Sequence, residues 1–569
     1  MKTTSLKVTL AGAASAVFLF SFLGCANMAG NDKPAQLQAA SGKALGQCEA
    51  LASSFKFNNT QINSAASAGA YCLVKGEMFK RKGSDGRDYA IGFEMRLPTD
   101  WSGRFYYQGN GGLDGVVQPA LGALGGGPLT GALAQGFAVI SSDAGHTGAQ
   151  TGVFGAEPQA RLDYGYQAVQ KLTPMAKALI GEAYGKAPDR SYIGGCSNGG
   201  RHVMVAMSRF GDQYDGYLAG APGYRLPNAA LAQLWGAQQW APLATAGATA
   251  PHPLSPQAPR IADLTTGFNA AERQTVANAV LAKCDALDGA KDGMVMATQA
   301  CQAAFDVMRD VPACAGDTRD AGGSCLTSAQ KQVVTDVFAG GKLADGSAIY
   351  RNFPHDIGIA GNDWPRWKFA FALALDPLSV GTVFSSPPTP VNAMTMKADE
   401  RLALFNSVND TYKESGLSLM TPPQNDNPTN LAALKARGAK VMLYHGVSDP
   451  IFSAEDTRQW VERVNAAQGG GSASNFARFF PVPGMNHCSG GPSVDQFDML
   501  TSLVKWVEQG IAPESVVATA RGAGNAGGVN AEVPKGWAAN RSRPLCAYPK
   551  TAKYSGSGNV EDASNFSCQ

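Results

Sequence analysis

Charge is scarce in this chain. Asp, Glu, Lys and Arg together make up only 16% of its 569 residues, and they leave a net charge of +2. This balance argues against a nucleic-acid partner or an acidic surface partner, because both attract a strong excess of positive charge. Extended disorder is excluded as well, since 44% of the residues are hydrophobic. We therefore expect a globular protein.

Several motifs that carry chemistry are also missing. The chain has no Cys-x-x-Cys, which argues against zinc ribbons and thioredoxin-like redox chemistry. It has no P-loop, no dinucleotide-binding Gly-x-Gly-x-x-Gly between a strand and a helix, no internal repeat and no cluster of transition-metal ligands. No organic cofactor is therefore expected.

The apolar run near the N-terminus is too short for a membrane anchor. It covers residues 8–23 and follows Lys2 and Lys7, which is typical of a signal peptide over residues 1–25. Residues 22–25 resemble a bacterial lipobox with Cys25 as the lipidated residue, while plain secretion is the alternative. We expect residues 26–45 to be a polar tether, and a lipid anchor at Cys25 to be the only membrane contact of this exported protein.

Cysteine usage fits an oxidising compartment. Eleven cysteines are present, and removing Cys25 leaves ten, an even number. Ten cysteines allow many connectivities, but their positions suggest four local pairs and one long-range pair. The predicted pairs are Cys48–Cys72, Cys284–Cys301, Cys314–Cys325, Cys546–Cys568 and Cys196–Cys488.

A nucleophile motif lies at Gly195-Cys196-Ser197-Asn198-Gly199. It reads Gly-x-Ser-x-Gly and stands between an apolar run and a helical pattern over residues 200–210. In the strand–turn–helix context, a tight turn lifts the serine hydroxyl above the sheet. The motif alone is weak evidence in a chain with 67 glycines, but it predicts Ser197 as a nucleophile.

A histidine with an adjacent cysteine strengthens this prediction. His487-Cys488 repeats the pairing of a cysteine with a catalytic candidate, in a chain with only six histidines. If His487 is the base for Ser197, the two side chains lie within hydrogen-bond reach, and their neighbours come close enough for a disulfide. The alternative is a core histidine beside a structural cysteine. We expect the Cys196–Cys488 bond to join nucleophile and base.

The acid of a triad is expected between Ser197 and His487. α/β-Hydrolases have the chain order serine, acid, histidine, and Asp449 follows a buried-strand pattern over residues 440–444. Its carboxylate would orient His487, although a turn aspartate before Pro450 is the simpler interpretation. His445, in the same loop, precedes the aspartate and is predicted to line the substrate pocket.

A glycine-rich loop follows an earlier strand pattern. Residues 104–108 read as a strand that enters Gly109-Asn110-Gly111-Gly112. α/β-Hydrolases take one oxyanion N–H from such a loop and another from the residue after the nucleophile. We expect Gly112 and Asn198 to donate these N–H groups; a flexible turn is the alternative for the loop.

The fold class is expected to be α/β, an α/β-hydrolase core with a large inserted lid, rich in disulfides. Core patterns cover residues 46–225 and 433–569. Between them, residues 226–432 are rich in Ala, Gln and Pro and show helical patterns with few strands. We interpret this block as a lid domain that sets substrate choice.

The lid contains an acidic loop. Asp285, Asp288 and Asp292 lie within eight residues, among glycines that allow sharp turns. Oxygen ligands at this density suit Ca²⁺, with the carbonyls of Ala290 and Met294 completing the shell; a solvated loop is the alternative. We predict a structural calcium site, since no nucleophile is adjacent.

Together these motifs resemble the tannase and feruloyl esterase family, which also contains mono(2-hydroxyethyl) terephthalate hydrolase. The resemblance covers most of the mature chain and rests on the Cys-Ser and His-Cys pairs, the segment from His445 to Asp449, the acidic loop and residues 483–492. It implies an α/β-hydrolase with a calcium-binding lid that cleaves esters of aromatic acids. It also implies Ser197, His487 and Asp449 as nucleophile, base and orienting acid.

The choice of substrate is less defined. In the terephthalate hydrolase the residue after the nucleophile is Glu, where this chain has Asn198, and a lid arginine directly follows a Trp. Here Pro365 follows Trp364, so Arg366 or Lys368 is left to hold a carboxylate. We therefore predict a feruloyl-esterase or tannase-like substrate, with mono(2-hydroxyethyl) terephthalate (MHET) as the alternative. The aromatic candidates for the pocket wall, which are equally candidates for the lid core, are Trp364, Trp367 and Phe452.

Two other classes of function share these features. A serine peptidase on the same fold would use the same triad, and a non-catalytic surface lipoprotein could keep the fold for binding. The intact triad argues against the second. The sequence leaves the oligomeric state open.

Overall fold

A computed structural model describes Met1 and residues 36–123, 131–420, 431–467 and 472–569. The predicted signal peptide, its Cys25 and the first part of the expected tether lie outside the described residues. Residues 34–569 form one compact unit. The following description concerns that unit.

The described residues form a central sheet of nine strands, in the order β13-β12-β9-β8-β6-β7-β4-β3-β2. The six strands from β13 to β7 are parallel, whereas β4, β3 and β2 continue the sheet antiparallel. The strands run over β2 Thr60–Ser67, β3 Tyr71–Lys82, β4 Asp88–Pro98, β6 Arg104–Gly109, β7 Ala138–Ser142, β8 Arg190–Cys196, β9 Gly216–Gly220, β12 Lys440–Gly446 and β13 Ala477–Val482. The expected α/β-hydrolase sheet is therefore present.

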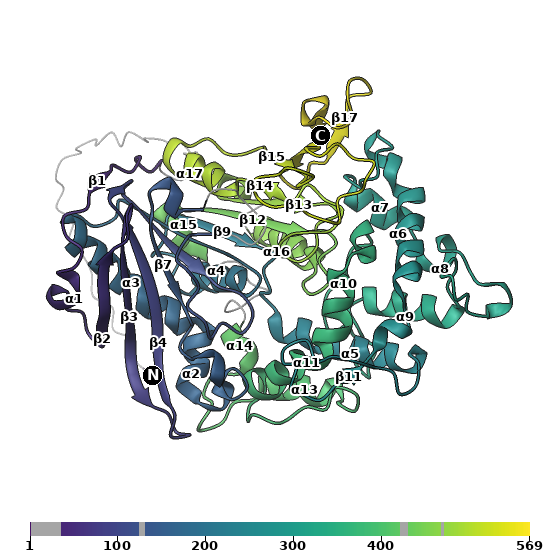
Figure 1. Ribbon diagram of the computed structural model, residues 1–569, viewed down its shortest axis with the longest axis horizontal. Coiled ribbons are helices and arrows are strands. Elements are labelled where there is room, and N and C mark those ends of the chain that lie inside the picture. Colours follow the sequence, from purple (N-terminus) through teal and green to yellow (C-terminus); the bar gives the residue numbers. More distant parts are fainter. Residues whose placement is uncertain (2–35, 124–130, 421–430, 468–471) are drawn as a thin grey trace. The chain divides into compact units, whose positions relative to one another are not determined.

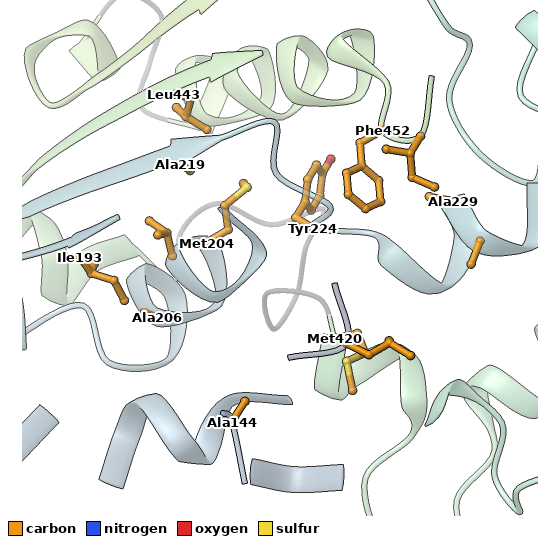
Figure 2. Close-up of a cluster of buried hydrophobic side chains, with 14 of the residues drawn as sticks. Ala144, Ile193, Met204, Ala206, Ala219, Tyr224, Ala229, Met420, Leu443 and Phe452 are labelled. Carbon is orange, nitrogen blue, oxygen red and sulfur yellow. The ribbon is translucent and has the colours of Figure 1, made fainter. Parts of the chain in front are cut away.

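The middle of the sheet is buried on both faces. Every residue of β9 and of β12 is buried, which is typical of parallel strands covered by helices. Figure 2 shows Ile193, Ala219 and Leu443 on neighbouring strands, with Met204 of α4 packed against them. The core helices run over α1 Leu51–Ser54, α2 Pro158–Leu162, α3 Ala168–Tyr184, α4 Asn198–Arg209, α16 Ala454–Ala467 and α17 Met499–Gln509.

The lid enters between two strands that are neighbours in the sheet. β9 and β12 pair directly. In the described part of the chain between them, the regular secondary structure is helical apart from the two-residue strands β10 Thr249–Ala250 and β11 Ile261–Ala262. Figure 1 shows these lid helices in teal and green. They run over α5 Leu226–Trp240, α6 Ala270–Cys284, α7 Thr298–Ala304, α8 Val307–Asp310, α9 Ser328–Phe338, α10 Asp363–Pro365, α11 Ala372–Ala374, α12 Asp376–Leu378, α13 Ala398–Asn406, α14 Gly416–Met420 and α15 Ala432–Arg437.

The chain segments at the two ends of this unit pack on the core. The C-terminal part forms a three-stranded sheet and a hairpin. β14 Gln496–Phe497 precedes α17, and β15 Ser515–Thr519, β16 Ser542–Cys546, β17 Ala552–Tyr554 and β18 Phe566–Cys568 follow it. At the other end, β1 Lys43–Ala44 pairs with β5 Asp100–Trp101. The amide of Gln36 donates to the carbonyl of Val507 at 2.8 Å. Residues 36–45 are therefore held against the core, and the prediction of a tether over this part is wrong.

All five predicted disulfides are confirmed, Cys48–Cys72, Cys196–Cys488, Cys284–Cys301, Cys314–Cys325 and Cys546–Cys568.

Among the described helices, none is by itself long and apolar enough to cross a membrane. One bent pair passes by length and composition, residues 363–374 with 376–384, which meet at 41°.

Candidate active site

The predicted nucleophile lies at a strained turn. Ser197 stands between the end of β8 and the start of α4 with φ 66° and ψ −128°, a conformation that side-chain-bearing residues rarely adopt. The flanking glycines make room for it. A Cβ at Gly195 would lie 2.5 Å from the carbonyl oxygen of Gly109, and one at Gly199 would lie closer still. The Gly-x-Ser-x-Gly pattern is thus explained by the close approach of β6 to the turn.

The other two members of the predicted triad meet this serine. His487 Nε2 lies 2.8 Å from Ser197 Oγ, and its Nδ1 lies 2.7 Å from Asp449 Oδ2. Asp449 is in the loop after β12, and His487 is in the loop after β13. Both loops leave the carboxyl ends of parallel strands, where α/β sheets place their sites. The arrangement has the hydrogen bonds of a Ser-His-Asp triad.

Asp449 is held from several sides. Its Oδ1 accepts from the backbone N–H of Ile451 at 2.9 Å and of Phe452 at 3.0 Å. Burial opposes its charge, but the charge of His487 and the hydrogen bonds from His445 and His487 keep the pKa of Asp449 well below its usual value. The carboxylate is therefore ionised when it orients the catalytic base.

His445 does not line the pocket as predicted. It is fully buried behind Asp449, with Nε2 3.3 Å from Asp449 Oδ2 and 3.0 Å from the Phe452 carbonyl. Its Nδ1 lies 2.8 Å from the hydroxyl of Thr457. His445 is the penultimate residue of the buried strand β12, and these contacts place it against the acid, outside the pocket lining.

Charged residues of the lid affect the pKa of His487. Burial lowers the pKa of His487, but the charge and hydrogen bond of Asp449 outweigh it, Asp363 adds to the increase and Arg366 opposes it, so the pKa is raised. Asp363 Oδ2 also accepts from the backbone N–H of His487 at 3.2 Å. The sequence analysis missed Asp363 because only the fold brings residues 124 positions apart together.

The Cys196–Cys488 disulfide joins the neighbours of nucleophile and base. Its Cα atoms are 6.1 Å apart across a sequence separation of 292 residues. The bond therefore fixes the turn that carries Ser197 relative to the loop that carries His487.

The two residues predicted to carry the oxyanion N–H groups lie beside Ser197. Asn198 is the first residue of α4, so its N–H has no acceptor within the helix. Gly112 has φ 64°, and its carbonyl accepts from the hydroxyl of Tyr164 at 3.2 Å. Both residues line the same pocket as Ser197. Their role as oxyanion donors stays a prediction.

A buried polar network holds the Asn198 side chain. Its Nδ2 donates to Asp114, and its Oδ1 accepts from Arg201 Nε at 2.6 Å. Asp114 Oδ2 also lies 3.3 Å from His202 Nε2. Since Asp114 follows the Gly112 loop by two residues, this network ties the two oxyanion donors together. Sequence reasoning missed Asp114, whose only signal was its place directly after the glycine-rich loop.

A pocket lies beside the nucleophile. Trp367 and Phe452 line it and pack edge-on against His487, with ring centroids 5.1 and 5.3 Å from the imidazole. The full lining is Gly112, Leu113, Ser197, Asn198, Leu226, Trp367, Leu375, Asp376, Ser379, Phe384, Ile451 and Phe452. Its mainly apolar walls suit an aromatic ligand.

The other predicted substrate contacts lie elsewhere. Trp364 is buried in the lid core, where its ring centroid lies 5.4 Å from that of Phe369. Arg366 is exposed, with its guanidinium over the Phe371 ring. Lys368 borders a separate small cavity behind Asp449. Of the three predicted aromatic walls, only Trp367 and Phe452 line the pocket.

The acidic loop of the lid folds around its own backbone. Asp285 Oδ1 accepts from the N–H groups of Asp292 and Gly293, and Asp292 is paired with Arg543. Burial, and then the charge of Asp292, raises the pKa of Asp288 to about 6. In the described part of the chain, no three Asp, Glu, His or Cys side chains are gathered as a metal-ligand set. The calcium site stays a prediction.

Comparison with known proteins places this site in a family context. The sequence model of the tannase and feruloyl esterase family matches residues 72–569. The chain is 38% identical over 539 residues to mono(2-hydroxyethyl) terephthalate hydrolase of Piscinibacter sakaiensis, covering 89% of this chain and 86% of that protein. It is 26% identical over 512 residues to a probable feruloyl esterase B-2 of Aspergillus fumigatus, covering 84% and 83%.

Solved structures of esterases have a similar fold. Feruloyl esterase B from Aspergillus oryzae superimposes with a TM-score of 0.71 at 25% identity, covering 92% of this chain and 99% of that one. Tannin acyl hydrolase from Aspergillus niger gives a TM-score of 0.62 at 20% identity, covering 91% and 92%. The second likeness concerns the fold.

Proposed function

The chain belongs to the tannase and feruloyl esterase family and is a carboxylic ester hydrolase, and from that premise we propose that it cleaves esters of hydroxylated aromatic acids. The observation that carries this proposal is the pocket at Ser197, whose walls Trp367 and Phe452 flank the catalytic histidine. Flat aromatic walls beside the nucleophile fit an aromatic acyl group. The proposed class of substrate is that of feruloyl esterases and tannases.

The geometry supports acyl transfer in two steps. Ser197 Oγ attacks the ester carbonyl while His487 Nε2 takes its proton, and the alkoxide is stabilised by the N–H groups of Gly112 and Asn198. His487 then protonates the leaving alcohol as the carbon–oxygen bond breaks. Water attacks the acyl-enzyme by the same route, giving the free acid and regenerating Ser197. Asp449 stabilises the imidazolium at each stage.

The pocket lining bears on which substituents the acyl ring can carry. A terephthalate monoester carries a carboxylate on its ring, which needs a cation or several donors when buried. Among the described residues that line the pocket, none is Lys or Arg. Arg366 is exposed, and Lys368 borders another cavity. This lining supports a neutral acyl ring.

Hydrolysis of MHET is the second candidate. It is favoured by the 38% identity to mono(2-hydroxyethyl) terephthalate hydrolase over most of both chains. The charge of Arg366 also lowers the pKa of His487, so this cation acts electrostatically on the site.

The test is a comparison of methyl ferulate, methyl gallate and MHET as substrates of the mature protein, with Ser197→Ala as control. The proposal expects hydrolysis of at least one hydroxylated ester, at a higher kcat/KM than MHET, that is lost in the variant. A preference for MHET would establish the second candidate instead.

Two other outcomes would point to other classes. Cleavage of chromogenic peptidyl amides in place of all three esters would indicate a serine peptidase. A protein that neither hydrolyses any of these substrates nor reacts with a fluorophosphonate at Ser197 would be a binding protein, and the proposal would fall.

For the acidic loop we propose a structural Ca²⁺ site. Asp285, Asp288 and Asp292 would supply carboxylates, and Ala290 and Met294 would supply carbonyls. Support comes from the mutual repulsion of the three aspartates, which raises the pKa of Asp285 and of Asp288 after burial and which a cation would relieve. EGTA should lower the Tm, and added Ca²⁺ should restore it, with little response in Asp288→Asn. An unchanged Tm in EGTA would refute the site.

For location we propose export with lipidation at Cys25. The five disulfides support an oxidising compartment outside the cytoplasm, and the lipobox-like residues 22–25 support the anchor. The intact mass of protein from a bacterial membrane fraction should show a diacylglyceryl adduct that Cys25→Ala removes. Recovery of unmodified protein from the medium would indicate plain secretion.

A further inference from the structure

One acidic side chain borders the substrate pocket without a role in the triad. Asp376 stands at the start of α12, where two lid helices meet at 41°. It lines the same pocket as Ser197, Trp367 and Phe452. A lone aspartate after the apolar run of residues 369–375 is therefore placed where the substrate ring is expected.

This carboxyl group is buried and incompletely satisfied. Asp376 is only 4% exposed, and its Oδ2 has no hydrogen-bond partner in the described structure. The nearby ammonium of Lys368 lies over the Phe353 ring, 3.7 Å from its centroid. A buried polar atom without a partner is costly. Such a group at the wall of a binding pocket indicates that a ligand supplies the missing partner.

The rest of the wall defines what that ligand offers. Trp367, Phe452, Phe384 and Leu375 are apolar and suit the faces of an aromatic ring, while Asp376 and Ser379 are the polar side chains among the residues the lid contributes. The hydroxyl of Ser379 donates to the Asp376 carbonyl at 3.1 Å, so it is already engaged. A hydrogen-bond donor carried by the ring would supply the side-chain partner that Asp376 lacks.

We propose that Asp376 is the specificity-determining residue of this esterase, and that it accepts a hydrogen bond from a phenolic hydroxyl on the acyl ring. This inference rests on the proposed function, which it refines to esters of phenolic acids. Burial raises the pKa of Asp376 above its usual value, opposed by the charge of Lys368. A carboxyl in that state still accepts from a phenol, whereas a ring carboxylate would add a second buried acid beside it. The same residue therefore selects against terephthalate monoesters.

The experiment uses two esters that differ only in ring hydroxyls, methyl caffeate and methyl cinnamate. Their kcat/KM ratio is measured for the wild type, for Asp376→Leu, which removes the acceptor at similar volume, and for Asp376→Asn, which keeps an acceptor oxygen. Asp410→Leu, the same change at an exposed lid position, is the matched control. Because each ratio is internal to one variant, partial loss of folded protein cancels.

The wild type should prefer the caffeate by about ten-fold or more, as sites built to pair a substrate hydroxyl do. Asp376→Leu should bring the ratio close to one, Asp376→Asn should lie between, and Asp410→Leu should match the wild type. A wild type without preference, or a preference that survives in Asp376→Leu, would overturn the inference.

A second measurement separates this inference from the proposed function. Benzylideneacetone and its dihydroxy derivative are ketones that cannot be hydrolysed, and they compete with p-nitrophenyl acetate for the pocket. The dihydroxy ketone should inhibit the wild type more strongly, and Asp376→Leu should lose that difference. Equal inhibition by both ketones would refute the role of Asp376 even if phenolic esters are hydrolysed. Loss of all Ser197-dependent aryl ester hydrolysis would instead remove the proposed function, and the inference with it.

Discussion

The turn at Ser197 and the lid bend at Asp376 line one pocket but are constrained in different ways. The turn is fixed by backbone: Ser197 has a rare φ, glycines allow β6 to approach, and a disulfide crosses to the histidine loop. The bend is formed by helices whose buried apolar residues mostly belong to the main hydrophobic core. Backbone constraints tolerate few residue types, whereas packing of apolar helices tolerates many. We therefore expect changes at the turn to affect the chemistry most, and changes at the bend to affect the choice of substrate most.

The largest expected effect comes from a change to the catalytic triad in the core. Asp449→Asn should lower kcat by about 10⁴-fold, because the imidazole would lose its orienting charge and its correct tautomer. The Tm should change far less than activity, since Asn retains an acceptor for the N–H groups of Ile451 and Phe452. Steady-state kinetics with methyl ferulate and a thermal melt check both. A kcat within ten-fold of the wild type would show that Asp449 is not the orienting acid.

The next effect compares a core disulfide with a lid disulfide. Removing Cys196–Cys488 as the double Ala variant should cost about 2–5 kcal/mol of unfolding free energy and should also lower kcat, because nucleophile and base lose their covalent link. Removing Cys314–Cys325, which spans 11 residues of the lid, should cost less stability and leave kcat within about two-fold. Chemical denaturation and kinetics provide the comparison. Equal losses of kcat in the two variants would contradict the division between core and lid.

A smaller effect concerns the network that joins the oxyanion donors. Asp114→Ala removes the carboxylate that accepts from the Asn198 amide. A shift of the oxyanion N–H groups should then lower kcat about 10–100-fold with little change in KM. Asp114→Asn, which suits the positive φ of 45° at this position, should recover part of the loss. A rise in KM at constant kcat would place Asp114 in substrate binding instead.

The smallest effect is a pair of opposite shifts in pH dependence. Asp363 raises and Arg366 lowers the pKa of His487, and the base must be neutral to accept the serine proton. Arg366→Gln should therefore move the acid limb of kcat/KM to higher pH, and Asp363→Asn should move it to lower pH, each by at most about one unit. Shifts in the same direction, measured on methyl ferulate, would exclude this account of how lid charges tune the base.

The sequence predicts the core better than the lid for the same physical reason. Ser197, Asp449 and His487 stand in turns with strict backbone requirements, and the cysteines beside two of them restrict the pairing, so local patterns reveal them. His445 is assigned to the pocket from its place in the acid loop, Trp364 from its aromatic ring and Arg366 from the family resemblance. The structure places them behind the acid, in the lid core and on the surface.

The residues that were missed share one property. Asp114, Asp363 and Asp376 act on the site through contacts between segments far apart in the chain. A lone charge gives no periodic signal, so only the packing of helices and loops shows which way it points. An aspartate within an apolar lid helix was nevertheless a signal that sequence reasoning could have used.

The most direct test of the central claim is fluorophosphonate labelling of the intact protein, followed by peptide mass spectrometry. The account predicts one adduct, on the peptide that contains Ser197, formed at a rate that falls about a thousand-fold or more in Asp449→Asn and to zero in Ser197→Ala. An adduct on another residue, or labelling of Ser197 that is indifferent to Asp449, would contradict the assignment of this triad as the catalytic machinery.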